Sequence, residues 1–189
     1  MQKPNRFLKL GSPVRELKLP LRDKRLDTNL TVRKHEKADI YEEILPQIRS
    51  LVEGEEDWIA NLGNAGSVIR HAFPDRISWV GFYLKHRDGL VLGPFQGKPA
   101  CVRIAMGRGV CGTAAKERKT IIVPDVHSFP GHIACDPDSR SEIVVPMLQG
   151  NTLLGVLDLD STAMDSFDET DAKYLKGVVD IVTGGSRIP

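Results

Sequence analysis

Apolar residues recur every three or four positions in two segments of the first half of the chain. The first segment predicts an amphipathic helix over residues 38–51. Pro46 lies inside it and implies a kink or an early break, because proline lacks the amide hydrogen that an interior helical position uses. The second segment covers residues 58–72, and Pro74 disfavours its continuation. The sequence therefore predicts two helices at the start of the folded region.

The pattern then changes to alternation rich in β-branched and aromatic residues, which is typical of strands. Residues 77–84 form the first such segment, and Asp88-Gly89 predicts a hairpin turn into residues 90–92. The glycine-rich stretch 107–112 predicts a turn that leads into a short helix ending near Arg118. Further strands are predicted over residues 100–105, 121–123, 142–148 and 153–159, with a turn at 149–151 joining the last two.

A final helix is marked at its start and along one face. Asp168 is a predicted N-cap, and Asp171 three residues later completes a partial capping box. Leu175, Val178 and Val182 share the apolar face of this helix. The predicted order is two helices, three strands, a short helix, three strands and a helix. Strands joined by tight turns favour a mainly antiparallel sheet with flanking helices, which is an α+β domain.

The composition is that of a globular protein without an electrostatic preference for polyanions. The chain has 189 residues, of which 41% are hydrophobic and 27% charged, enough for one domain of ordinary size and a tail. Its 26 basic and 25 acidic residues give a formal net charge of +1. Neither nucleic acid nor a membrane surface is therefore expected as a partner. No apolar run approaches the roughly 20 residues that a membrane-spanning helix requires.

Residues 1–33 differ in charge from the rest, and we expect the folded domain to occupy residues 34–189. A flexible or loosely packed extension is the simplest interpretation of the first part. A mitochondrial presequence is a minor alternative, because prolines interrupt any amphipathic helix there. No apolar stretch typical of a secretion signal follows the basic residues, so a cytoplasmic location is expected. The basic residues are Lys3, Arg6, Lys9, Arg15, Lys18, Arg22, Lys24 and Arg25.

Three cysteines raise the question of what their thiols do. An odd number fits poorly with a structural disulfide framework, and in a reducing compartment cysteines serve chemistry, metal binding or packing. Cys101 falls in a predicted strand, Cys111 in the glycine-rich turn and Cys135 in the loop 125–140. A small buried hydrophobe is the simplest interpretation of each, and for Cys111 it stays open beside a functional one. The spacings match no zinc knuckle, and a His132-x-x-Cys135 pair alone is weak support for a metal site.

Cys135 has the strongest independent indication of a chemical role. It lies in a long loop containing prolines and glycine, and such loops concentrate function rather than core packing. A free thiol with a pKa of about 8.5 is mostly protonated at neutral pH, so nearby histidines could help to hold a thiolate. His127 and His132 are the candidates, although both could be surface residues, which we favour for His127.

Carboxylates occupy strand positions where apolar residues are expected. Glu142 opens one predicted strand, and Asp158 and Asp160 stand two apart in the next, so period-two geometry turns both aspartates to the same face. On spacing alone a solvated strand end is the simpler interpretation, whereas a pocket wall would let paired carboxylates bind an ammonium group or hold a proton. Trp79 and Tyr83 also share a strand face. That placement usually means core, and it would also suit a small amphipathic ligand.

Seven segments of the chain carry a resemblance to one enzyme family. They are residues 79–83 (WVGFY), 92–97 (LGPFQG), 107–113 (GRGVCGT), 124–127 (PDVH), 130–136 (PGHIACD), 141–144 (SEIV) and 155–161 (GVLDLDS). Together they closely resemble the free methionine-(R)-sulfoxide reductases, which are GAF-fold enzymes. The likeness runs from about residue 34 to about residue 182. The segment 131–136 and the three-cysteine pattern are highly specific to that family, and sensor-type GAF domains in general lack them.

The resemblance implies a role for each cysteine. Cys135 matches the attacking thiol, Cys101 the resolving thiol, and Cys111 the third cysteine, whose role is secondary. Every position of the family pattern is filled in this chain. A homodimer is also implied. The residues that match the lining of the methionine sulfoxide pocket are Trp79, Tyr83, Glu142, Asp158 and Asp160.

The implied reaction is thiol-dependent reduction of free methionine-(R)-sulfoxide to methionine. It would leave a sulfenic acid on Cys135, which condenses with Cys101 to a disulfide that an external dithiol, such as a thioredoxin-like protein, reduces. One acid would protonate the sulfoxide oxygen, and the others would bind the ammonium group that a residue inside a peptide lacks. No metal or organic cofactor is needed. The alternative from another class is a non-catalytic GAF-type sensor module, which needs the pocket but not the two cysteines.

Overall fold

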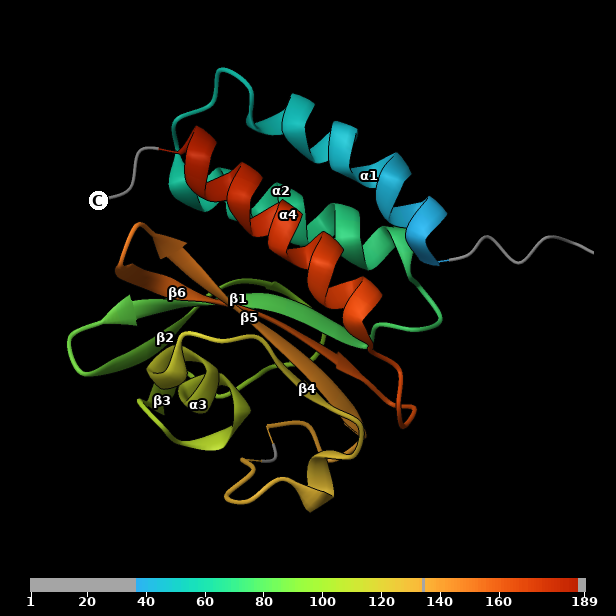
Figure 1. Ribbon diagram of the computed structural model, residues 1–189, viewed down its shortest axis with the longest axis vertical. Helices are drawn as coiled ribbons and strands as arrows, with labels where there is room; N and C mark the ends of the chain where they lie inside the picture. The colour runs from blue at the N-terminus through green and yellow to red at the C-terminus, as the bar shows by residue number, and fades with distance from the viewer. Residues whose placement is uncertain (1–36, 134, 187–189) are drawn as a thin grey trace, which may run out of the picture. The chain divides into compact units, whose positions relative to one another are not determined.

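The computed structural model describes residues 37–133 and 135–186 (Figure 1). All of these fall within the domain expected over residues 34–189. The expected extension 1–33 and its targeting alternative lie outside the described residues, so this division of the chain stays a prediction. In the described part, none of the helices is long and apolar enough to cross a membrane.

The helices and strands follow the order that the sequence predicts. The strands form one sheet in the order β3-β2-β1-β6-β5-β4, in which each pairing is antiparallel. The first two strands make the predicted hairpin, and the α+β class is confirmed. The elements are α1 (Lys37–Val52), α2 (Trp58–Ala72), β1 (Trp79–His86), β2 (Gly89–Gln96), β3 (Arg103–Ala105), α3 (Gly109–Glu117), β4 (Ile121–Val123), the 3₁₀ turn η1 (Val126–Ser128), β5 (Ser141–Gln149), β6 (Thr152–Ser161) and α4 (Glu169–Gly185).

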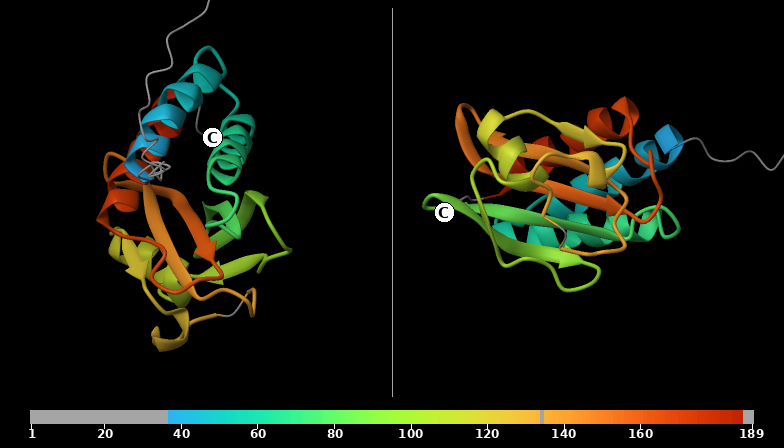
Figure 2. Two further views of the ribbon diagram at one scale, coloured as in Figure 1. Left: turned by 90° about the vertical axis from the view of Figure 1, so that its right-hand side faces the viewer. Right: turned by 90° about the horizontal axis from the view of Figure 1, so that it is seen from below.

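Helices lie on both faces of the sheet (Figures 1 and 2). The long helices α2 and α4 pack on one face, α1 lies against these two helices on the same side, and the short α3 lies on the other face. Two apolar cores correspond to these layers, a larger one under the three long helices and a smaller one under α3. Successive side chains of a strand point to opposite faces, so Phe82 of β1 belongs to the larger core, whereas Trp79 and Tyr83 belong to the smaller.

Helix α1 continues through Pro46 to Val52, so the expected early break does not occur. Pro46 is on the exposed side of the helix, where water can bond the backbone carbonyl that its missing amide leaves free. On the opposite side Ile44 and Ile48 are buried in the larger core. Burial of this apolar face on both sides of the proline holds the helix together against the local cost.

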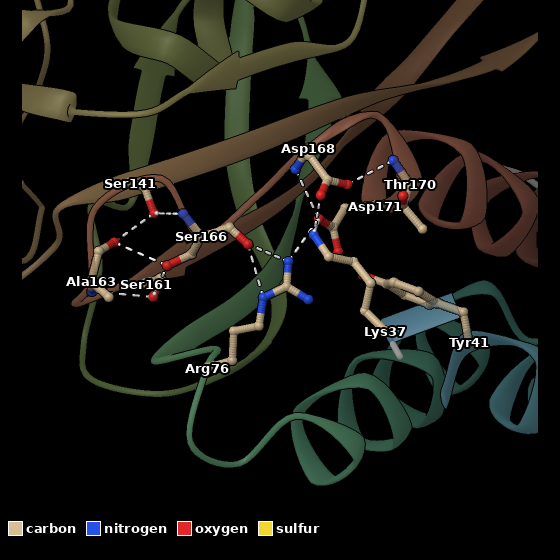
Figure 3. A network of polar contacts seen from close by, with 10 residues as sticks. All are labelled: Lys37, Tyr41, Arg76, Ser141, Ser161, Ala163, Ser166, Asp168, Thr170 and Asp171. Atoms are coloured by element: carbon tan, nitrogen blue, oxygen red, sulfur yellow. Dashed lines mark hydrogen bonds and ion pairs between the residues drawn. The ribbon is translucent and has the colours of Figure 1, made fainter. Parts of the chain in front are cut away.

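A buried carboxylate ties three elements of the helical layer together (Figure 3). Asp171 of α4 accepts a hydrogen bond from the Tyr41 hydroxyl at 2.9 Å and pairs with Lys37 and Arg76 at 2.7 Å each. The backbone amide of Asp168 also donates to Asp171 at 2.9 Å, and Asp168 itself caps the helix. The predicted N-cap and capping box are therefore confirmed. Four donors around one carboxylate offset the cost of removing its charge from water.

Strand register brings the acidic and aromatic positions to neighbouring points on the sheet. Trp79 of β1 pairs with Asp160 of β6, which in turn pairs with Glu142 of β5. Two residues along, Gly81 pairs with Asp158. Their side chains share the face that α3 covers, because alternate residues of a strand share a face. A side chain at Gly81 would obstruct this arrangement, since its Cβ would lie 2.5 Å from Cη2 of Trp79.

Candidate active site

A pocket lies on the α3 side of the sheet, under the chain segment that carries Cys135. Besides the residues predicted for it, the pocket takes in Arg108, His132 and Ser139. Arg108 and Ser139 were missed by sequence reasoning, and no spacing or periodicity marks either of them. Cys101 does not line the pocket, although it is bonded to Cys135. The predicted site residues that do line it are Trp79, Tyr83, Cys111, Cys135, Glu142, Asp158 and Asp160.

Cys101 and Cys135 form a disulfide whose Cα atoms are 5.5 Å apart. The sequence places Cys101 in a strand, and this is wrong, because only Arg103–Ala105 pairs with β2. The carbonyl of Cys101 accepts a hydrogen bond from the Tyr83 hydroxyl at 3.0 Å instead of joining the sheet. A side chain from β1 thus holds the segment before β3 away from the strand ladder. Both bonded cysteines are half-buried, so an external thiol has access to them.

Cys111 lies in the first turn of α3 and not in the preceding turn, where the sequence places it. It is buried, carries a free thiol, and its Sγ lies 3.9 Å from Oε1 of Glu142. Burial, reinforced by the charge of Asp158, raises the pKa of this thiol well above its ordinary value. Since the thiolate is the reactive form, Cys111 is chemically quiet at neutral pH in this arrangement.

The three carboxylates form one wall of the pocket, so a solvated strand end is the wrong interpretation of their spacing. Glu142 and Asp158 are buried, and Asp160 is half-buried. Burial raises the pKa of Asp158 to about 6, opposed by hydrogen bonding with Cys111 and Glu142. Burial and the neighbouring charge of Asp158 raise the pKa values of Glu142 and Asp160 well above their ordinary range. The cluster therefore holds protons at a pH where isolated carboxyl groups are ionised.

The two aromatic residues support the segment that carries Cys101. Trp79 and Tyr83 are buried with ring centroids 6.1 Å apart, and Trp79 stacks on Phe95 at 5.6 Å. The indole nitrogen of Trp79 donates to the carbonyl of Lys98 at 3.0 Å, three residues before Cys101. The indole N–H of Trp79 and the hydroxyl of Tyr83 thus hold residues 98 and 101, respectively, against the sheet. The rings thus leave an apolar surface toward the pocket and use their polar atoms behind it.

His132 lines the pocket, with Nδ1 4.0 Å from Oε2 of Glu142. Burial lowers the pKa of His132, and the charge of His127 lowers it further, so the ring is neutral at physiological pH. His127 is a surface residue bonded to Asp125 at 3.2 Å, as favoured from the sequence. The nearby histidine therefore meets a carboxyl group and not a thiolate in this disulfide-bonded arrangement.

A cation is the other ligand to consider for the acidic wall. Donor atoms of Cys111, Glu142 and Asp158 lie within 4.8 Å of one another, which on distance alone could hold a metal ion. Their buried surroundings favour the protonated forms of the thiol and of Glu142, and a metal ion requires deprotonated ligands. We assign no metal to this group.

Comparison with known proteins identifies the family of this site. The family model of the GAF domain matches residues 65–183. The free methionine-R-sulfoxide reductase of Escherichia coli (strain K12) is 46% identical over 143 residues, which cover 76% of this chain and 86% of that enzyme. The chain belongs to the free methionine-R-sulfoxide reductase family. The member of this reductase family from Saccharomyces cerevisiae is 44% identical over 153 residues, covering 77% of this chain and 85% of the yeast protein.

A solved member of the reductase family has the same fold. The free methionine-R-sulfoxide reductase from Neisseria meningitidis, determined in complex with its substrate, is 51% identical to this chain and superposes with a TM-score of 0.77. The match covers 79% of this chain and 90% of the Neisseria chain. The GAF fold and the oxidoreductase class implied by the sequence resemblance are confirmed.

The raised pKa of Asp158 in this reductase-family pocket predicts a cost in stability. A carboxyl group with a pKa of about 6 in the folded chain and about 3.9 in the unfolded chain binds its proton more tightly when folded. Between these values stability falls as pH rises, and it stays low above pH 6. We expect Asp158→Asn to raise the melting temperature at pH 8 by at least about 2–4 °C, with a smaller gain at pH 4.

Thermal unfolding followed by circular dichroism from pH 4 to pH 8 measures this difference. Asp180→Asn is the control, because it removes an exposed carboxylate from a surface ion pair with Lys176. An equal gain for Asp158→Asn at both ends of the pH range would contradict the assignment of the cost to the Asp158 charge.

Proposed function

We propose that this protein reduces free methionine-(R)-sulfoxide to methionine, with Cys135 as the attacking thiol. The observation that carries the proposal is the disulfide between Cys101 and Cys135 at the edge of a pocket walled by Glu142, Asp158 and Asp160. A sulfoxide reductase needs a thiol pair that gives up two electrons and an acid that releases the oxygen. Cys135 and the carboxyl groups line one pocket here, and Cys101 is bonded to Cys135 at its edge. The substrates named for the family's relatives support this choice.

In the first step the Cys135 thiolate attacks the sulfoxide sulfur. The oxygen takes up one proton and passes from the substrate sulfur to the Cys135 sulfur, so that one sulfur–oxygen bond breaks and another forms. The sulfur–sulfur bond made by the attack breaks, methionine leaves, and Cys135 remains as a sulfenic acid. The sulfoxide sulfur is thereby reduced by two electrons, and the cysteine sulfur is oxidised by two. Cys135 suits this role because it lines the pocket, whereas Cys101, to which it is bonded, does not.

Glu142 supplies the proton that the departing oxygen requires. Its pKa is raised well above the ordinary value by burial and by the charges of Asp158 and Asp160, which favours the protonated form that a general acid needs. Asp158, with a pKa of about 6, is ionised at neutral pH and binds the substrate's ammonium group. Methionine sulfoxide inside a peptide has no such group, which accounts for a preference for the free amino acid.

The second step resolves the sulfenic acid. The Cys101 thiol attacks the sulfur of Cys135, a disulfide forms, and water leaves with the oxygen. A dithiol protein of the thioredoxin type then exchanges with this disulfide and becomes oxidised itself. A reducing compartment such as the cytoplasm provides that donor. The homodimer implied by the family resemblance stays a prediction that light scattering of the purified protein tests.

The assay that tests the function uses separated diastereomers. The reduced protein is incubated with dithiothreitol and either the R or the S form of free methionine sulfoxide, and methionine is quantified by chromatography. We expect turnover of the R form alone, and no turnover of the R form when it is blocked at the amino group. A protein that binds the R form without producing methionine would instead be the sensor module.

The Cys101→Ser variant separates the two steps. Without a resolving thiol, the sulfenic acid on Cys135 has no internal partner, so we expect one equivalent of methionine in a first burst and little turnover with thioredoxin afterwards. Rapid-quench measurement of methionine per protein molecule gives the burst. Normal thioredoxin-driven turnover in this variant would move the resolving role to Cys111.

A further inference from the structure

Lys98 links the two chain segments that carry the disulfide. Its Nζ lies 2.6 Å from Oδ2 of Asp138 and 3.2 Å from Asp136. Lys98 precedes Cys101 by three residues, and Asp136 directly follows Cys135. The lysine and its two partners therefore bracket the point where the cysteines meet, and no functional role is yet assigned to them.

The chain segments on both sides of this link are held by hydrogen bonds. The carbonyl of Lys98 accepts the Trp79 indole hydrogen bond, which holds the lysine backbone to β1. On the other side, Asp136 accepts a hydrogen bond from the amide of Asp138 at 3.0 Å, and its side chain is only 11% exposed. The backbones on both sides of the link are thus hydrogen-bonded in place, although the side chains of Lys98 and Asp138 are 60% and 64% exposed.

Lys98 provides the polar contact between these segments. One segment comprises residues 97–102, and the other comprises the described residues of 130–139, which leaves out residue 134. Among the described residues, the hydrogen bonds and ion pairs of Lys98 are the ones that connect these two segments. The cysteines are 34 positions apart in sequence, so chain connectivity does little to keep them together. The hydrogen bonds from Trp79 and Tyr83 hold the Cys101 segment to β1, and the ion pairs of Lys98 are the polar contacts that join this segment to the Cys135 segment.

We propose that Lys98 is a positioning residue that keeps Cys101 within reach of Cys135 through its ion pairs with Asp136 and Asp138. This inference rests on the proposed function, since it explains how the sulfenic acid is resolved quickly. The link raises the effective concentration of one thiol at the other sulfur, and it leaves the attack on the substrate unchanged. Lys98 and Asp138 do not line the pocket, whereas Asp136 does, so the single-turnover burst below tests whether the link affects the second step alone.

An equilibrium with glutathione tests the link without any substrate. The fraction of Cys101–Cys135 disulfide is measured by alkylation and mass spectrometry over a series of oxidised-to-reduced glutathione ratios. We expect Lys98→Met to lower the effective concentration of the pair about three- to tenfold, as suits two partly exposed ion pairs. Lys98→Arg should restore it. Lys176→Met, which removes a surface ion pair with Asp180 elsewhere, is the matched control and should match the wild type.

Salt supplies a readout that a purely structural role would not change. Salt screens exposed ion pairs, so in 1 M sodium chloride the effective concentration of the cysteine pair in the wild type should fall toward the value of Lys98→Met. The value of Lys98→Met itself should not change with salt. In single turnover with the R sulfoxide, Lys98→Met should release a normal burst of methionine while dimedone traps more sulfenic acid. Equal effective concentrations in wild type and Lys98→Met, or a wild-type value independent of salt, would overturn the proposal. If the wild type forms no methionine, the proposed function is refuted. The glutathione equilibrium would still measure whether Lys98 holds the two cysteines together.

Discussion

Replacing Cys135 by serine is expected to slow the first turnover of free methionine-(R)-sulfoxide at least about a thousandfold. The serine hydroxyl keeps the size of the thiol, but at neutral pH it is a weak nucleophile unless a base activates it. Among the described residues no histidine or carboxylate is hydrogen-bonded to the side chain at position 135, and His132 instead lies 4.0 Å from Glu142. Methionine formed per protein molecule in a rapid-quench experiment without added reductant measures this rate.

Cys101→Ser is the matched control for this prediction, because it removes the same disulfide and leaves Cys135 in place. Both variants lose the cross-link between the two segments, so any loss caused by loosening of the pocket affects them equally. Only Cys135→Ser should lose the burst of methionine. A burst that survives in Cys135→Ser would show that a different thiol attacks the substrate, and the pocket position of Cys111 would make it the next candidate.

Much of the fold could be predicted because local rules decide it. The apolar period of α2 and the Asp168 cap depend on neighbours in sequence, and both are found as predicted. The hairpin between β1 and β2 also forms, but its turn lies one residue earlier than predicted, at Arg87 and Asp88, and Gly89 already pairs with His86. Pro46 is different, since its local preference would end α1. Ile44 and Ile48 are buried in the larger core, where α1 packs against α2 and α4, and this burial decides the outcome. Its contribution to helix stability depends on the partner helices and so cannot be read from the α1 sequence alone.

The errors at Cys101 and Cys111 also come from contacts between distant residues. Alternation around Cys101 fits a strand, but the Tyr83 hydroxyl binds the carbonyl that would have joined the ladder. Cys111 stands between glycines, which favours a turn by local propensity. At Gly112 a side chain would meet the carbonyl of Ala105, so the second glycine serves close packing of α3 on the β3 end and not a turn.

For the two aspartates of the pocket wall, residue spacing predicts a shared strand face but not whether that face is buried. Period two correctly predicts that Asp158 and Asp160 share a face. Which face is buried depends on α3 and on the register of β5 against β6, which sets Glu142 opposite Asp160. A pattern within one strand cannot contain that information, so the choice between a solvated end and a pocket wall required the family resemblance.

Replacing Glu142 by glutamine is expected to lower the first-turnover rate about 10²- to 10⁴-fold, the usual contribution of a positioned general acid. Glutamine has nearly the same shape and can still donate a hydrogen bond, but it cannot release a proton to the departing oxygen. Substrate binding should change much less, because ionised Asp158 is retained. A fall in rate with little change in KM is therefore the expected result. Glu117→Gln, at the exposed end of α3, is the control.

The pH profile gives this prediction its sharpest test. Glu142 must be protonated, and its pKa is raised well above the ordinary value, so the wild-type rate should decline as pH rises through that raised pKa. Asp158 must be ionised, so substrate binding should weaken as pH falls through about 6. Glu142→Gln should lose the alkaline decline, because that decline reports loss of the Glu142 proton. It should keep the acidic decline, because that decline reports protonation of Asp158. An alkaline decline that persists unchanged in Glu142→Gln would instead assign the role of proton donor to Asp160. The pKa of Asp160 is also raised by burial and by the charge of Asp158.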